Sequence, residues 1–127
     1  MNHFELGALG EKYAEKYLKK QHYKILEKNY KVKLGEIDII AQYGGYMVFV
    51  EVKSRSADPL VSGYYAVDKK KRLHIIRTAD FYMRRKKSLL QPRFDIIEVE
   101  IDKISRKVVS CHHYENAFIW EGSYARF

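Results

Sequence analysis

Hydrophobic and polar residues recur along the chain with two spacings, and the change of spacing separates helical from extended segments. Between residues 3 and 21, apolar residues recur every three or four positions, which indicates an amphipathic helix. Residues 67–87 show a second pattern of this kind. Segments rich in β-branched and aromatic residues are expected to be strands. These segments cover residues 24–33, 35–42, 46–54, 93–101 and 106–114. The order helix, three strands, helix, two strands predicts an α/β fold with a mixed sheet flanked by helices.

The segment over residues 35–54 reads as a hairpin, because Gly44-Gly45 separates two of the predicted strands. Paired glycines are a strong signal for a two-residue turn. The facing pairs are then Tyr43–Tyr46, Asp38–Glu51 and Glu36–Lys53. A four-residue loop on the same glycines keeps this register, whereas a three- or five-residue loop shifts it by one.

One face of this hairpin is expected to be charged and the other wholly apolar, because side chains alternate along a strand. The charged set consists of Glu36, Asp38, Glu51 and Lys53. The apolar set consists of Ile37, Ile39 and Ala41 against Val48, Val50 and Val52. Ile40 and Phe49 share the charged face, so the charges are expected at the rim of a second buried surface.

Two carboxylates that face each other across a hairpin repel, and partial burial strengthens the repulsion. A raised pKa, a salt bridge from Lys53 or a bound divalent cation would relieve it. Asp38 and Glu51 carry the hard oxygen ligands that suit Mg²⁺ or Mn²⁺, and the backbone carbonyl of Val52 would add a third. The alternative is a plain ion-pair ladder, in which Glu36 pairs with Lys53 and Asp38 pairs with an arginine.

With a metal bound, this set of residues is suited to phosphodiester hydrolysis. The cation would polarise the phosphate and activate water. Lys53 would orient or deprotonate that water, or stabilise the charge that develops on phosphorus. Asp38, Glu51 and Lys53 are therefore the expected catalytic residues.

The same residues carry a resemblance to a known family. Gly35-Glu36-Ile37-Asp38, followed by the run from Val48 to Arg55, resembles the uncharacterised YraN-type bacterial family. That family is placed by similarity in the PD-(D/E)XK nuclease superfamily, near the archaeal Holliday-junction resolvases. Further points of likeness are Gly10-Glu11, Ala14, Lys69 to Arg72, Arg93-Phe94-Asp95 and Asn116-Ala117-Phe118.

The resemblance implies a restriction-endonuclease-like core and a metal site built from Asp38, Glu51 and Lys53. In resolvase-like relatives a glutamate of the first helix joins the metal, which assigns that role to Glu11, with Glu36 in support. The implied activity is that of a Mg²⁺- or Mn²⁺-dependent DNA endonuclease acting on branched or single-stranded structures, and a homodimer is compatible with it. A non-catalytic nucleic-acid-binding module with the same fold, or an adaptor with only an ion-pair ladder, are the alternatives.

The charge balance favours a polyanionic partner. Lys and Arg number 24 against 16 Asp and Glu, which gives a net charge of +8, and nucleic acid is the expected polyanion. Lys69, Lys71 and Arg72 open the second helix and are expected to contact phosphates. Arg55 continues the face that carries Lys53 and is expected to do the same.

The remaining features constrain the setting of the protein. Cys111 is the single cysteine, which excludes an intramolecular disulfide and a Cys-rich zinc site. No apolar run approaches the roughly 20 residues that cross a bilayer, so a cytoplasmic protein without membrane partners is expected. One domain over residues 1–120 and a tail over 121–127 are predicted. His112 and His113 are expected on opposite strand faces, and Asp95 is expected to be a structural carboxylate.

Overall fold

The computed structural model describes residues 1–57 and 67–119 of the chain. Most of the loop expected over residues 55–66 lies outside these described residues. The same holds for the predicted tail over 121–127 and for the domain boundary at residue 120.

The described residues form seven elements in the predicted order, and the expected α/β class is confirmed. The helices are α1 (His3–Lys20) and α2 (Lys69–Lys86). The strands are β1 (Lys24–Val32), β2 (Gly35–Tyr43), β3 (Tyr46–Ser56), β4 (Gln91–Ile101) and β5 (Val108–Phe118).

Both helices begin at polar residues that cap them. The side chain of Asn2 accepts a hydrogen bond from the backbone N–H of Glu5, and the side chain of Glu5 accepts one from the backbone of Asn2, so α1 opens with a capping box. At the start of α2, Asp68 accepts a 2.8 Å hydrogen bond from the backbone N–H of Lys71. These caps satisfy backbone donors that have no partner within the helix.

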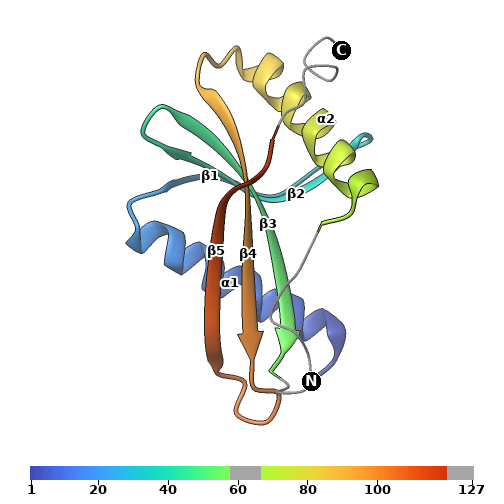
Figure 1. The fold of residues 1–127 in the computed structure, drawn as a ribbon, viewed down its shortest axis with the longest axis vertical. Coiled ribbons are helices and arrows are strands. Elements are labelled where there is room, and N and C mark those ends of the chain that lie inside the picture. The colour runs from blue at the N-terminus through green and yellow to red at the C-terminus, as the bar shows by residue number, and fades with distance from the viewer. Residues whose placement is uncertain (58–66, 120–127) are drawn as a thin grey trace.

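The five strands form one mixed sheet in the order β1-β2-β3-β4-β5. Strands β3 and β4 are parallel, and the other neighbours are antiparallel. A parallel pair needs a crossover connection, and α2 lies in that connection. Figure 1 shows β3, β4 and β5 running down the long axis, while β1 and β2 cross them near the middle.

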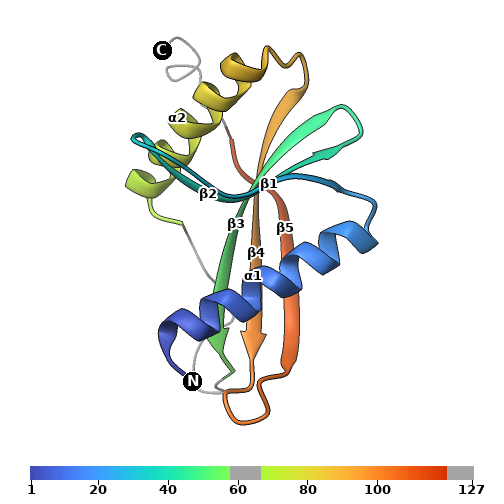
Figure 2. The ribbon, with the colours of Figure 1, turned by 180° about the vertical axis from the view of Figure 1, so that it is seen from behind.

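Each helix covers a different face of the sheet, as the two opposite views show (Figures 1 and 2). The core on the α1 side includes Ala14, Leu18, Ile39, Ala41, Val48, Val50, Val52, Ile97, Val99 and Ile101. The core on the α2 side includes Ile37, Ile40, Phe49, Ile75, Ile76, Ala79, Tyr82, Phe94 and Ile96. Burial of these apolar side chains on both faces explains the nearly continuous apolar runs of the central strands.

The hairpin register predicted from Gly44-Gly45 is confirmed where the two strands pair. Tyr43 faces Tyr46, and the ladder continues to Ile39 opposite Val50. The prediction for Ile37 was wrong, because this side chain packs in the α2-side core and not with Ile39. The alternation of β2 breaks at Asp38, level with Asn29 of β1, whose φ of 51° interrupts the pleat there.

The closing strand pair is also shifted from its prediction. Strand β5 starts at Val108 and not at residue 106, because Asp102 organises the preceding turn. Its carboxylate accepts hydrogen bonds from the backbone of Ile104 and the hydroxyl of Ser105. Strand β4 starts two residues earlier than expected, where the Gln91 N–H donates to the Gly45 carbonyl.

Neither of the two described helices is long and apolar enough to cross a membrane.

Candidate metal and nucleic-acid site

The candidate site lies where β2 separates from β3. The ladder between these strands ends at Ile39–Val50, while β2 stays paired with β1 as far as Gly35. Asp38 is the first residue past the separation, and its Oδ2 accepts a 2.8 Å hydrogen bond from the backbone N–H of Val52. This bond anchors the carboxyl group of Asp38 to β3 in place of the next ladder bond.

Asp38 and Glu51 lie close together, although the ladder between β2 and β3 ends one pair before them. Burial raises the pKa of Asp38 to about 8, and a hydrogen bond with Glu51 and the Glu51 charge add to the effect. Glu51 itself is only 5% exposed. The raised pKa of Asp38 follows from the approach of two acids at one poorly solvated position.

Glu11 and Glu36 are close enough to this pair for their charges to interact with it or with each other. Burial raises the pKa of Glu11, and the charges of Glu36 and Glu51 raise it further. The charge of Glu11 in turn contributes to the raised pKa of Asp38. Acids on three elements, α1, β2 and β3, therefore influence one another through their charges.

The packing of α1 on β3 sets the position of Glu11. A Cβ atom at Gly10 would lie 1.6 Å from the Ser54 hydroxyl oxygen, so only glycine allows this approach. Glu11 follows Gly10 directly and is thus carried to the second half of β3, close enough for the Glu51 charge to act on it.

Lys71 makes a close contact with one of these acids. Its Nζ lies 2.5 Å from Glu51 Oε2, which joins the start of α2 to β3. The same oxygen is buried and has no hydrogen bond of good geometry with any described residue, so the contact is chiefly one of charge. The sequence pattern predicts phosphate contacts for Lys71, and the structure places it against the acid instead.

Lys53 lies beside β4 and not beside β2. The parallel register places Lys53 next to Glu98, whereas Glu36 pairs with Lys31 of β1. The predicted facing of Glu36 and Lys53 is therefore wrong, because β2 has already left β3 at that level.

Arg55 is engaged within the sheet. Its Nε lies 3.9 Å from Glu98 Oε1 and its Nη2 lies 3.4 Å from Glu100 Oε2. Glu98 is fully buried, burial raises its pKa, and neither of its carboxylate oxygens has a hydrogen bond from a described residue. Sequence reasoning missed Glu98, although a charge inside the apolar run of β4 was a signal for it.

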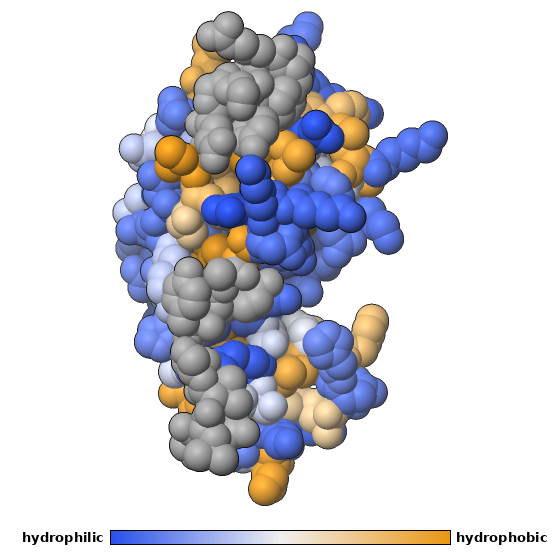
Figure 3. Space-filling model, turned by 45° about the vertical axis from the view of Figure 1, so that its right-hand side comes forward, coloured by the Kyte–Doolittle hydropathy of each residue, from blue (hydrophilic) through white to orange (hydrophobic). Residues whose placement is uncertain are grey.

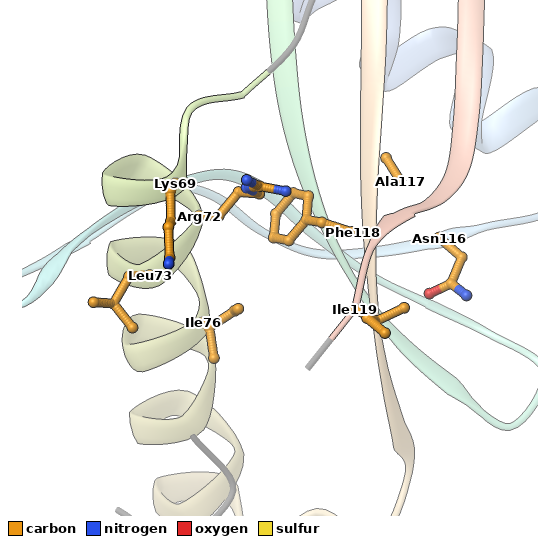
Figure 4. A pocket seen from close by; sticks show the side chains of 8 residues that line it. All are labelled: Lys69, Arg72, Leu73, Ile76, Asn116, Ala117, Phe118 and Ile119. Carbon is orange, nitrogen blue, oxygen red and sulfur yellow. The ribbon is translucent and has the colours of Figure 1, made fainter. Parts of the chain in front are cut away.

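Lys69 and Arg72 line a cavity of about 390 Å³ between the start of α2 and the end of β5 (Figure 4). Its other walls are Leu73, Ile76, Asn116, Ala117, Phe118 and Ile119. Long hydrophilic side chains project across the face of the molecule shown in Figure 3. The two cations line a cavity of mixed polar and apolar character, which is compatible with the predicted phosphate contacts.

Asp95 is held in a separate, fully bonded network on the α1 face. Arg93 donates two hydrogen bonds to it, of 3.0 and 2.7 Å, and His113 Nε2 lies 2.7 Å from its Oδ2. Tyr17 bonds the other ring nitrogen of His113 at 3.0 Å. These bonds lower the pKa of Asp95 against the effect of burial. They are what the predicted structural role of Asp95 requires.

The donor set at the strand separation suits a hard cation. Asp38 and Glu51 offer carboxylate oxygens, and one oxygen of Glu51 is buried without a directional hydrogen bond. Among residues 1–57 and 67–119, no three His, Cys, Asp or Glu side chains are close enough to hold a metal by themselves. Mg²⁺ commonly binds through one or two carboxylates and keeps several waters, so the pair fits it.

The fold and the site together define a class of protein. It is a small α/β protein with a mixed sheet, in which two carboxylates and a lysine lie where strands β2 and β3 separate. A profile of the uncharacterised protein family UPF0102 matches residues 10–99, and the chain belongs to that family.

Several relatives align over nearly their whole lengths. A UPF0102 protein of Caldanaerobacter subterraneus is 44% identical over 119 residues, covering 93% of this chain and 98% of the relative. One from Caldicellulosiruptor saccharolyticus is 41% identical over 121 residues, covering 93% and 100%. One from Clostridioides difficile is 44% identical over 119 residues, also covering 93% and 100%. The predicted membership of an uncharacterised bacterial family is confirmed.

Proposed function

We propose that this protein is a metal-dependent nuclease that hydrolyses phosphodiester bonds, with branched or single-stranded DNA as its substrate. The supporting observation is the pair of Asp38 and Glu51, in which a buried carboxylate lies beside a carboxyl group with a pKa of about 8. Such a pair destabilises a fold unless a cation neutralises it, and strongly shifted pKa values concentrate at functional sites.

Asp38 and Glu51 would hold a Mg²⁺ or Mn²⁺ ion, with the Val52 carbonyl as a further ligand, and Glu11 would assist through its charge. When bound, the ion supplies Lewis-acid activation of the phosphate and of an attacking water. The hydrogen bond from the Val52 N–H holds one oxygen of Asp38, and the other oxygen would be the one offered to the ion. Glu36 supports the site through its charge.

Lys53 is two residues beyond Glu51 on β3 and so points to the same face of the sheet. Its ammonium group would orient the attacking water and stabilise negative charge on the phosphate in the transition state. Lys69 and Arg72 would bind phosphates on either side of the bond that is cut, which positions the strand without reading its bases.

The decisive experiment is a cleavage panel with single-stranded, duplex, flap and four-way DNA in Mg²⁺ or Mn²⁺. Wild-type protein should cut at least one substrate. Asp38→Asn and Lys53→Met should reduce the rate by about 100-fold or more. Lys103→Met, in the turn between β4 and β5, is the matched control and should cut normally. Equal rates in all four proteins would attribute the cleavage to a contaminant and overturn the proposal.

A nucleic-acid-binding module without catalysis is the second candidate, and the contact of Lys71 with Glu51 favours it, because a lysine can neutralise the acid without a metal. Such a module would bind DNA in a salt-dependent way, and Asp38→Asn would leave both its affinity and its lack of cleavage unchanged.

A further inference from the structure

Lys71 is held at the edge of the acidic site by the start of α2. Its backbone N–H donates to the Asp68 side chain at 2.8 Å, in the first turn of the helix. One turn further on, Ile75 and Ile76 are buried in the α2-side core, so the helix start is fixed against the sheet. The backbone of Lys71 is therefore anchored near Glu51, and its long side chain is the part that can change partner.

The two partners of this ion pair differ strongly in exposure. The side chain of Lys71 is 46% exposed, whereas that of Glu51 is 5% exposed. The carboxylate is locked in the sheet, and the lysine reaches it from the solvent side. A long, half-exposed lysine side chain can rotate away at a modest cost in free energy.

The oxygen that Lys71 contacts, Glu51 Oε2, is the one that has no directional hydrogen bond. A divalent cation bound to this carboxylate would lie within a few ångströms of the ammonium group and repel it. An ion at Glu51 and the lysine contact seen here therefore exclude each other.

We propose that Lys71 alternates between two partners, pairing with Glu51 while no divalent cation is bound and turning to a substrate phosphate when one is. This inference rests on the proposed metal-dependent function. In the second state Lys71 joins Lys69 and Arg72, which already stand at the same end of α2. The positive charge that faces a phosphate is then greatest when the divalent cation is bound.

Metal affinity tests the first half of this proposal without any need for cleavage. Mn²⁺ binding at pH 7 is measured by titration calorimetry for wild type, Lys71→Met and the matched control Lys70→Met, which removes the same charge from the exposed neighbouring position. Lys71→Met should bind Mn²⁺ about threefold to tenfold more tightly than wild type, because the ion no longer displaces a lysine. Lys70→Met should change the affinity by less than about twofold.

DNA affinity tests the second half. Binding to a four-way junction is measured in Ca²⁺, used as a cation that supports binding without rapid cleavage, and again in EDTA. Lys71→Met should weaken binding in Ca²⁺ and have little effect in EDTA, whereas Lys70→Met should act equally in both. Lys71→Gln, a polar variant, repeats both measurements in case the Met variant does not fold.

Each outcome decides between the alternatives. An unchanged or weaker Mn²⁺ affinity in Lys71→Met overturns the role of Lys71 and leaves the nuclease proposal intact. Tighter Mn²⁺ binding, with a DNA effect confined to Ca²⁺, supports the role of Lys71 even if no substrate is cut, in which case only the hydrolytic proposal fails. Absence of Mn²⁺ binding in all variants overturns both.

Discussion

At the scale of single residues, Asp38 dominates the electrostatics of the site. Its pKa of about 8 lies far above its ordinary value of 3.8 because the group is buried beside Glu51. The folded protein thus holds this proton more tightly than the unfolded chain does. The resulting stabilisation is complete below pH 3.8 and is lost as the pH rises toward 8. At neutral pH without a cation, Asp38 therefore works against folding.

Asp38→Asn should remove this pH dependence while keeping an oxygen for the Val52 N–H. In EDTA, the variant should match wild type at pH 4 and exceed its free energy of unfolding at pH 8 by about 1–2 kcal/mol. This is less than the full shift would give, because Asp38 is partly exposed. Urea denaturation at the two pH values measures the difference. Asp80→Asn, which removes a carboxylate that is paired with Arg84 on α2, serves as control. Parallel curves for wild type and Asp38→Asn would contradict the assignment.

At the scale of elements, the contact of α1 with β3 determines whether Glu11 reaches the site. Gly10→Ala would place a Cβ 1.6 Å from Ser54 Oγ and 2.8 Å from Ser54 Cβ, so helix and strand must separate. We expect a loss of about 1–3 kcal/mol in the free energy of unfolding. Gly7→Ala, in the same helix, meets no atom within 4 Å and should stabilise by up to about 1 kcal/mol.

A double variant separates packing from helix propensity. Ser54→Gly removes both clashing atoms, so Gly10→Ala should cost much less in its presence than alone. Thermal and urea unfolding of the single and double variants give the coupling energy. Equal costs in the two backgrounds would show that α1 does not depend on this close approach.

The elements also show what the sequence could predict and what it could not. The register from Tyr43–Tyr46 to Ile39–Val50 follows from local turn chemistry, and its prediction is confirmed. The orientation of Ile37 was not predictable in this way, because alternation does not continue past the point where β2 leaves β3. That separation depends on the whole sheet and leaves no local pattern.

The contacts that depend on the parallel strand pair were harder to predict from the sequence. Lys53 is the ladder neighbour of Glu98 only because β3 and β4 align in parallel through a long crossover. Likewise, Lys71 meets Glu51 only because α2 packs at one level of the sheet. A hydrophobic pattern indicates that such elements exist and which faces are buried, but it does not fix a register between segments that are far apart in sequence.

At the scale of the whole molecule, the net charge of +8 matters through its distribution. Lys69 and Arg72 stand at the start of α2, next to the acidic site, whereas Lys103 and Lys107 belong to the turn between β4 and β5. Figure 1 shows that this turn and α2 lie toward opposite ends of the long axis. If DNA is bound across the site, Lys69 and Arg72 neutralise its phosphates and release counterions, whereas Lys103 and Lys107 do not.

The salt dependence of DNA affinity distinguishes these two ends. For each phosphate that a variant no longer neutralises, the slope of log K against log salt should decrease in magnitude by about 0.7–0.9. Lys69→Gln combined with Arg72→Gln should thus flatten the slope by about 1.5, while Lys103→Gln with Lys107→Gln should leave it unchanged although both double variants remove the same charge. Equal slopes in both double variants would mean that DNA responds to the net charge alone, and the start of α2 would then not be the binding surface.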